Sequence, residues 1–357
     1  MTVKELYSSY EEYAPFIVDR FERRPSFLSL NPNKLQPVLS NHLFNNGFRP
    51  IYKDNKKYAI CLTHDIDYLY EHETTRMRVM NSLRALDRKD TDKFFYYLKN
   101  LVRLKMNPDW VLDKFIDLEA RYGLPATYYF LALQPGELDF NYHAESIKSY
   151  FSRIEEIGGE VGLHGGHEAF KSLKKLQSEK QLLENAAGKT IQGYRNHYLR
   201  FKTPDTWEYL EKLGFIYDTT FGYADLTGYR NGLCYPYRPF NINTNAYMDI
   251  VELPLIVMDV SFWKYMGLNS ENSFVLFKKI AKDVKDVNGV LTILWHNNNL
   301  TGEPGNLFNK ILDYIRKEED AWIANSKELV LFWKEKNLPA MEEMLQPSFD
   351  KKLYSIM

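Results

Sequence analysis

The sequence predicts an α/β fold in which parallel strands alternate with helices and close into a barrel. From Tyr58 onward, short apolar runs alternate with amphipathic stretches, and seven or eight such units follow one another. Repeated right-handed strand–helix–strand units build a parallel sheet, and their number here favours a closed barrel over an open doubly wound sheet. The 357 residues suffice for one large domain or two ordinary ones.

Each strand is expected where a short apolar run lies between turn residues. The expected strands are residues 58–62, 127–133, 160–163, 190–194, 215–218, 250–255, 290–295 and 321–323.

Helices are expected where apolar residues recur with a helical period. In residues 109–122 these residues lie largely on one face, Pro108 and Asp109 provide a start signal, and Gly123 provides a stop. The same pattern predicts helices over residues 144–157, 171–187, 204–213, 271–287 and 308–317.

Three further segments flank or interrupt the barrel, which is expected over residues 58–340. Residues 1–57 form an N-terminal extension, whose prolines prevent long helices, and residues 341–357 form a C-terminal tail. A helical insertion is expected over residues 71–107. Within it, residues 76–105 carry nine Lys or Arg and three acids. This composition favours a solvated helical pair that covers the barrel, with weak contact to an anionic membrane surface as the alternative.

Composition limits the classes of partner. The net charge of −1 gives no overall field that would attract nucleic acid, and two cysteines do not form a disulfide framework. The polar N-terminus does not resemble a secretory signal, and no run reaches the roughly 20 apolar residues of a membrane span. A cytoplasmic location is therefore expected. The oligomeric state is not indicated.

Polar side chains gather at the carboxyl ends of the expected strands, where barrels of this type place their functional groups. The first strand ends in THDID, residues 63–67, and alternation places Asp65 and Asp67 on the same side with His64 facing away. Five of the eight histidines follow strand ends: His64, His164, His167, His197 and His296.

This set of residues suits metal-assisted hydrolysis. A carboxylate with two imidazoles is a common ligand set for a catalytic divalent metal, and a second carboxylate can accept the proton of a metal-bound water. An arginine favours the ionised form of that carboxylate, and a separate histidine can protonate the leaving group. Each residue also has a structural alternative, such as helix capping by the aspartates, but their joint location favours the catalytic interpretation.

In order and spacing, these motifs resemble the polysaccharide deacetylases with a NodB-homology domain, carbohydrate esterase family 4. The resemblance covers about residues 58–336. Its motifs are THDID at 63–67, PATYYF at 125–130, EVGLHGG at 160–166, GYRNHYLRF at 193–201, LGFIYDTTFGYAD at 213–225 and LTILWH at 291–296.

The resemblance implies a distorted (β/α) barrel, usually with seven strands, and a role for several residues. Asp65 would be the general base, oriented by Arg195. Asp67 and His164 would bind a divalent metal, with zinc favoured and cobalt, manganese or nickel as alternatives. His296 would be the general acid. The backbone N–H near Tyr198 would help to hold the oxyanion.

The chain departs from the family pattern at two motifs. The second family histidine usually lies four residues after the first, but here that position is Glu168 and the histidine is His167. We expect His167 to be the third ligand, with Glu168 as the alternative. His197 replaces a usual proline and is a further ligand, acid or substrate-binding candidate. Substrate contacts are also expected from Tyr198, Asp218 and Asp225, and either aspartate or Glu252 is the expected partner of His296.

The leading functional hypothesis is a metal-dependent hydrolase that removes an acyl group from a carbohydrate or glycan precursor, and N-acetyl is the favoured acyl group. One alternative is a metal-dependent amidohydrolase of a small non-sugar compound, which a pocket closed by the 76–105 insertion would favour. Another is a non-catalytic glycan-binding relative, although the presence of both Asp65 and His296 argues against it.

Overall fold

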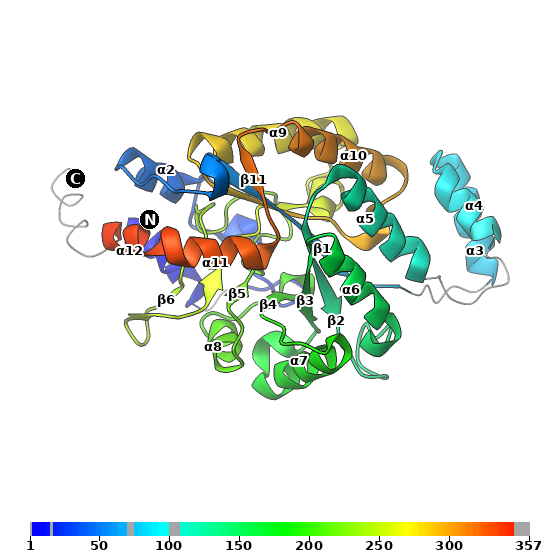
Figure 1. Cartoon of the computed structure of the whole chain (residues 1–357), viewed down its shortest axis with the longest axis horizontal. Helices are drawn as coiled ribbons and strands as arrows, with labels where there is room; N and C mark the ends of the chain where they lie inside the picture. The colour runs from blue at the N-terminus through cyan, green and yellow to red at the C-terminus, as the bar shows by residue number, and fades with distance from the viewer. Residues whose placement is uncertain (1, 15–16, 70–74, 100–107, 346–357) are drawn as a thin grey trace.

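The computed structural model describes residues 2–14, 17–69, 75–99 and 108–345. Its main sheet is parallel throughout and follows the strand order β8-β5-β4-β3-β2-β1-β10-β9, with β11 paired to β1. The sheet curls into a half-barrel surrounded by helices (Figure 1). The strands are β1 Tyr58–Ile66, β2 Ala126–Leu131, β3 Glu160–Gly165, β4 Gly193–Asn196, β5 Tyr217–Asp218, β8 Val251–Glu252, β9 Val257–Met258, β10 Val290–Leu294 and β11 Ala321–Ile323.

The strand β1 is the centre of this sheet. All nine of its residues are buried. It pairs with β10 on one side; on the other, β11 pairs with its beginning and β2 with its end. A strand covered on both faces is buried along its whole length, as parallel sheets require. The residues that follow its apolar half, from Thr63 to Asp67, are therefore buried although four of the five are polar.

Two features of the sheet differ from the sequence prediction. The expected strand 250–255 is the two-residue β8, and the separate strand β9 was not predicted. The paired path ends at β8 and β9, which do not pair with each other among the described residues. Such short strands give no alternating pattern to detect, because two residues show no period. A small antiparallel hairpin, β6 Phe240–Asn241 and β7 Ala246–Tyr247, lies outside the main sheet.

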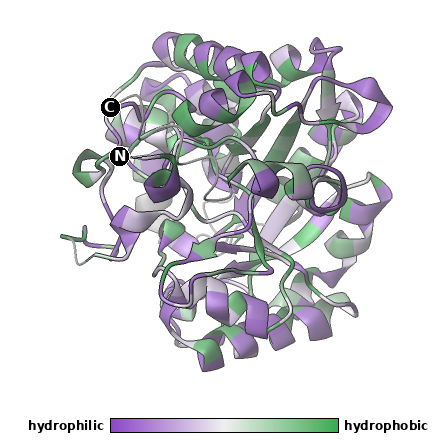
Figure 2. Cartoon of the chain, turned by 90° about the vertical axis from the view of Figure 1, so that its left-hand side faces the viewer, coloured by the Kyte–Doolittle hydropathy of each residue, from purple (hydrophilic) through white to green (hydrophobic). Residues whose placement is uncertain are grey.

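Helices surround the sheet, and hydrophilic and hydrophobic residues alternate along them (Figure 2). Asn269 caps the N-terminus of α9 by accepting from the N–H of Asn272 at 2.8 Å. α10 begins six residues before the predicted start, because Pro304 is tolerated in a first helical turn. The bounds are α5 Pro108–Tyr122, α6 Lys148–Glu156, α7 Leu173–Ala187, α8 Asp205–Lys212, α9 Ser270–Asp286, α10 Gly302–Arg316, α11 Ser326–Lys336 and α12 Leu338–Met344.

The N-terminal extension packs against the barrel. It contains α1 Val3–Tyr7 and α2 Val38–Asn45, and its buried side chains join the same hydrophobic core as the strands. The hydroxyl of Tyr52, for example, donates to the carbonyl of Asn288 at 2.7 Å. At the other end of the chain, α12 crosses the boundary expected at residue 340, and residues 346–357 of the expected tail lie outside the described residues.

The insertion contains two helices, α3 Thr75–Asp87 and α4 Thr91–Lys99, which lie side by side and project from the body of the molecule (Figure 1). Asp92 connects this pair to α5 through an ion pair with Lys114, at 3.3 Å. The rest of the expected insertion, residues 71–74 and 100–107, lies outside the described residues, and the proposed membrane contact stays a prediction. None of the described helices combines the length and apolar character that a membrane span needs.

Candidate metal centre and catalytic site

Asp65 and Asp67 lie together at the carboxyl end of β1, with exposures of 2% and 7%. Asp65 Oδ1 accepts from Nη1 of the fully buried Arg195 at 3.0 Å. The Arg195 guanidinium also donates to the hydroxyl of Thr63 at 2.8 Å and to both oxygens of Thr219. These bonds fix Arg195 from three sides, so Asp65 is held in one orientation by a permanent positive charge.

Asp67, His164 and His197 bring three potential ligand atoms within 4.8 Å of one another. Asp67 Oδ1 lies 3.1 Å from His164 Nε2 and 3.4 Å from His197 Nδ1, and the two imidazole nitrogens are 3.1 Å apart. All three residues are buried. One carboxylate and two imidazoles in this arrangement match the three protein ligands that catalytic zinc sites use.

The bonds at the far side of each ring set which nitrogen faces the cluster. His164 Nδ1 lies 3.0 Å from the carbonyl of Arg195, which only accepts, so the proton is on Nδ1 and the lone pair of Nε2 points at Asp67. His197 Nε2 lies 3.4 Å from Asp139 Oδ2. Outer carboxylates and carbonyls of this kind orient metal-binding histidines.

Two observations test whether these residues fit a metal ion. Two imidazole nitrogens approach to 3.1 Å only with a proton or a metal ion between them. Asp67 Oδ1, buried in the same cluster, has no hydrogen-bond partner among the described residues, and a buried unsatisfied oxygen is costly without a cation. The residues therefore fit a divalent metal.

Electrostatic effects in the cluster point the same way. Burial would raise the pKa of Asp67, but the imidazoles of His197 and His164 hold it well below its usual range. Burial would lower the pKa of His197, but Asp67 and Asp139 raise it to about 9. The carboxylates of Asp67 and Asp139 thus favour a cation at this position, and a bound metal would supply it in place of the proton of His197.

The expected third ligand, His167, does not join this cluster. Its Nδ1 lies against Nη1 of Arg200, and Glu168, the expected alternative, pairs with Lys171 at 3.0 Å. The chain turns away after β3 because Glu179 Oε2 accepts from the N–H of Gly166 at 2.7 Å. His197, from the end of β4, lies in the position for which His167 was the expected residue.

His296, after β10, faces the same site. Its Nδ1 lies 2.6 Å from Asp259 Oδ1, and its Nε2 lies 3.9 Å from Asp67 Oδ2. Asp259 Oδ2 accepts from the backbone N–H of His296 and from Asn299 Nδ2, both at 2.8 Å. Burial would lower the pKa of His296, but Asp259 and Asp67 raise it to about 10. These carboxylates thereby favour the charged form of the ring, the form that a general acid needs.

The residues expected to pair with His296 lie elsewhere. Asp218 Oδ1 accepts from the hydroxyl of Thr220 at 2.5 Å, and its carboxyl pairs with that of Glu252. Burial and the neighbouring Asp218 raise the pKa of Glu252 well above its usual range. Asp225 accepts from the N–H and hydroxyl of Ser26. Neither aspartate lines the cavity at the site, so the substrate contacts predicted for Asp218 and Asp225 are not supported.

A cavity of about 260 Å³ opens above the cluster. Asp65, Asp67, His197 and His296 form its polar floor. The remaining lining is mainly aromatic and apolar, with two cations at its edge: Arg23, Tyr68, Tyr198, Leu199, Met258, Val260, Lys264, Tyr265 and Asn298. The substrate contacts predicted for Tyr198 and His197 are sterically available here.

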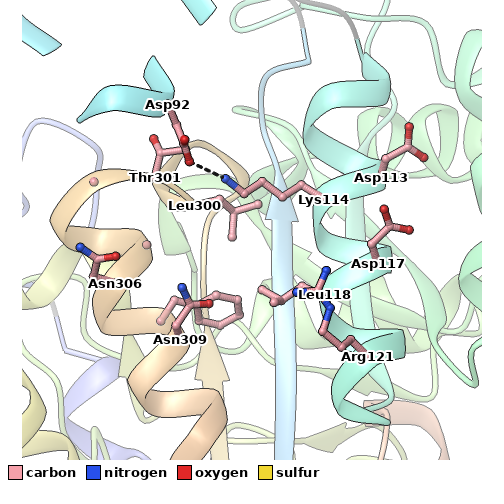
Figure 3. Close-up of a pocket in the computed structure, with 13 residues that line it drawn as sticks. Asp92, Asp113, Lys114, Asp117, Leu118, Arg121, Leu300, Thr301, Asn306 and Asn309 are labelled. Atoms are coloured by element: carbon pink, nitrogen blue, oxygen red, sulfur yellow. Dashed lines mark hydrogen bonds and ion pairs between the residues drawn. The ribbon is translucent and has the colours of Figure 1, made fainter. Parts of the chain in front are cut away.

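A larger cavity, of about 480 Å³, lies between α5 and α10 and contains none of these residues (Figure 3). Lys114 crosses it toward Asp92, while Asn306 and Asn309 line the opposite side. We therefore place the candidate site at the smaller cavity, where the titratable groups converge.

His64 faces away from this site, as strand alternation predicts. Its Nδ1 lies 2.9 Å from the carbonyl of Trp295, and its Nε2 contacts the buried carboxylate of Glu119. Because Trp295 precedes His296, this buried pair ties the end of β1 to the end of β10.

The sequence did not identify Asp139, Asp259 or Arg23 as site residues. Asp259 directly follows β9, so the rule that polar groups gather after strands covers it once that strand is known. Asp139 lies in the loop after β2, eight residues beyond its end, where that rule gives no signal. Arg23 precedes every strand of the barrel, and no pattern in the sequence connects it with the site.

Comparison with known proteins supports the fold. No family model and no curated protein sequence matches the chain. Among solved structures, a putative polysaccharide deacetylase from Mycobacterium smegmatis matches with a TM-score of 0.55 at 15% identity, covering 82% of this chain and 95% of its own. The peptidoglycan deacetylase PdaC from Bacillus subtilis matches with a TM-score of 0.43 at 13% identity, covering 83% and 100%. BA3943, a pseudoenzyme of carbohydrate esterase family 4 from Bacillus anthracis, matches with a TM-score of 0.42 at 11% identity, covering 77% and 66%.

The first of these matches shows a shared fold. The predicted distorted (β/α) barrel of the NodB type is thereby confirmed.

Proposed function

We propose that this protein is a metal-dependent hydrolase that removes an acyl group from a carbohydrate or glycan precursor. The acyl group that we favour is N-acetyl. One observation carries the proposal: the Asp65–Arg195 and His296–Asp259 pairs flank the cluster of Asp67, His164 and His197. Four of these residues, Asp65, Asp67, His197 and His296, line the same cavity. A base, an acid and a metal ligand set are the parts that hydrolysis of an amide or ester needs.

Asp67, His164 and His197 would hold the metal, which when bound would polarise the acyl carbonyl and lower the pKa of a bound water. Asp65 accepts the proton of the attacking water. The backbone N–H of Tyr198 donates to the oxyanion that forms as the carbonyl carbon becomes tetrahedral. His296 donates the proton on Nε2 to the departing nitrogen or oxygen, and Asp259 stabilises its charged form beforehand.

The ligand set favours zinc, because nitrogen donors with one carboxylate are typical of zinc, whereas magnesium and calcium prefer oxygen ligands alone. Cobalt, manganese and nickel are the alternatives. The aromatic lining from Tyr68, Tyr198 and Tyr265 supports a sugar as substrate, because sugar rings pack on aromatic faces.

A small non-sugar amide is the second candidate, and the modest cavity volume is the observation that favours it. The insertion helices α3 and α4 contribute none of the residues that line this cavity. The small-amide candidate therefore gains no support from a pocket closed by the insertion. Retention of a complete acid, base and ligand set argues against a binding protein without activity.

The proposal is tested by acetate release from N-acetylated and O-acetylated sugar oligomers and from a small acetanilide, with protein loaded with zinc or cobalt. We expect release from a sugar substrate, its loss after chelation, and its recovery when metal is restored. Release from the anilide alone would favour the small-amide alternative. Absence of release from all substrates by fully loaded protein would contradict the proposal.

A further inference from the structure

The loop after β4 has an unusual backbone conformation. Tyr198 and Leu199, neither of them glycine, have φ values of +60° and +54° in succession. The left-handed region is unfavourable for an ordinary residue, because its Cβ comes too close to the following carbonyl oxygen. Such a loop keeps its shape only when surrounding groups hold it. Here the loop carries both His197 and the N–H of Tyr198, so its shape sets the geometry of the proposed site.

The N-terminal extension supplies three contacts to this loop. Arg23 Nη1 donates to the carbonyl of Tyr198 at 3.0 Å. The ring of Phe21 stacks on the ring of Tyr198, with centroids 4.4 Å apart and planes at 18°. Glu22 Oε2 pairs with Nη2 of the buried Arg200 at 2.7 Å. Together these contacts hold the carbonyl and the ring of Tyr198 and the side chain of Arg200 in the same loop.

Arg23 is itself held firmly. Its Nε and Nη2 donate to Asp19 Oδ2 at 2.8 and 2.6 Å, and Nη2 also lies 3.2 Å from the hydroxyl of Tyr265. Asp19 Oδ1 accepts from the N–H groups of Phe21 and Arg23, which closes residues 19–23 into a tight turn. The side chain of Arg23 is 8% exposed and lines the cavity of the site. Its guanidinium is therefore placed before any substrate binds.

We propose that residues 19–23 form a clamp that fixes the peptide between Tyr198 and Leu199, with Arg23 as a positioning residue for the oxyanion donor. The inference rests on the proposed function for its catalytic consequence. The bond from Arg23 holds the carbonyl of Tyr198, and the stacked ring of Phe21 holds its side chain. Together they oppose rotation of Tyr198 out of its left-handed conformation, which keeps its N–H directed for catalysis. The extension is thus part of the machinery although it precedes every strand of the barrel.

The test compares Arg23→Ala and Arg23→Lys with Arg49→Ala in the whole, metal-loaded chain. Arg49 carries the same charge in the same N-terminal extension, but it is exposed and donates to the carbonyls of Phe44 and Phe48, outside the clamp. We expect Arg23→Ala to lower kcat about 10–100-fold with KM within about twofold, since misplacing a catalytic group costs on this scale. Arg23→Lys should recover part of the loss, and Arg49→Ala should stay close to wild type.

A second readout does not depend on turnover. Amide hydrogen exchange across residues 196–201 should accelerate at least about tenfold in Arg23→Ala, while zinc content and exchange in β1 stay unchanged. Unchanged exchange at 196–201, or a raised KM with unchanged kcat, would overturn the clamp. If loaded wild-type protein hydrolyses nothing, the proposed function fails, and the exchange comparison alone decides whether the clamp holds the loop.

Discussion

Buried polar side chains lie at both ends of the barrel, and they differ in how their hydrogen bonds are satisfied. Near the amino ends of the strands, Glu160 Oε2 accepts from the hydroxyls of Thr127 and Tyr217, both at 3.0 Å, and from the N–H of Lys327 at 2.8 Å. At the carboxyl ends, Asp67 Oδ1 is buried without a hydrogen-bond partner among the described residues.

The difference separates a structural cluster from a functional one. The hydroxyls around Glu160 can donate to it in either protonation state, so that cluster is complete within the protein. The cluster at Asp67 places a carboxylate and two imidazoles face to face and leaves Asp67 Oδ1 unsatisfied, which a cation would relieve. Burial alone therefore does not mark the candidate site; the convergence of ligand atoms around an unsatisfied carboxylate oxygen does.

The largest effect on activity is expected at Asp65, within the carboxyl-end cluster. Asp65→Asn keeps the size of the side chain but removes the base, so kcat should fall about 10²–10⁴-fold. Zinc content should stay at one ion per chain, because Asp65 is not among the three ligands. Steady-state kinetics with parallel elemental analysis checks this, and turnover equal to wild type would remove Asp65 as the base.

The next largest effect concerns metal affinity, and two histidines provide a matched pair. Loss of a residue that only orients a ligand weakens metal binding about 10–100-fold. His197→Ala removes a ligand itself, so its effect on zinc affinity should be larger than this. His167→Ala should leave affinity within a few-fold, because His167 contacts Arg200. Competition titration with a chromophoric chelator measures both; the reverse order would restore His167 as the ligand.

A smaller effect is expected at Asp139, which contacts the far nitrogen of His197. Asp139→Asn keeps the shape but removes the negative charge that orients the ring, so zinc affinity should fall about 10–100-fold. The same titration applies, with Asp225→Asn as the matched carboxylate outside the cluster. Equal affinities for Asp139→Asn and wild type would mean that His197 needs no outer partner.

The smallest effect concerns stability at the amino end. Burial raises the pKa of Glu160 to about 7, above its value of about 4.3 in an unfolded chain. The stability that protonated Glu160 contributes is present below the unfolded pKa and is lost as pH rises through about 7, by about 1–3 kcal/mol. Glu160→Gln should flatten this decline between pH 5 and 8 in urea unfolding. A slope as steep as that of wild type would show that Glu160 does not titrate there.

The sequence predicted the part of the site that local patterns encode. Asp65, Asp67, His164, Arg195 and His296 each end or follow a strand whose apolar run is visible, and the structure brings all five together. Asp259 was missed because β9 has only two residues, and Asp139 because it lies in the loop after β2.

Two other features had no local signal at all. Which residue is placed as the proposed third ligand depends on the direction in which the chain leaves β3, where the N–H of Gly166 donates to Glu179. The contact of Arg23 with Tyr198 joins residues 175 positions apart. Contacts between loops that are distant in sequence leave no periodicity, so only the three-dimensional structure reveals them.

The central claim is that Asp67, His164 and His197 hold a divalent metal. The most direct measurement is the anomalous difference density at the zinc absorption edge from crystals of zinc-loaded protein. We predict one peak at about 2.0–2.2 Å from an oxygen of Asp67, Nε2 of His164 and Nδ1 of His197. A peak bound by His167 or Glu168, or the absence of a peak between these three residues, would contradict the claim.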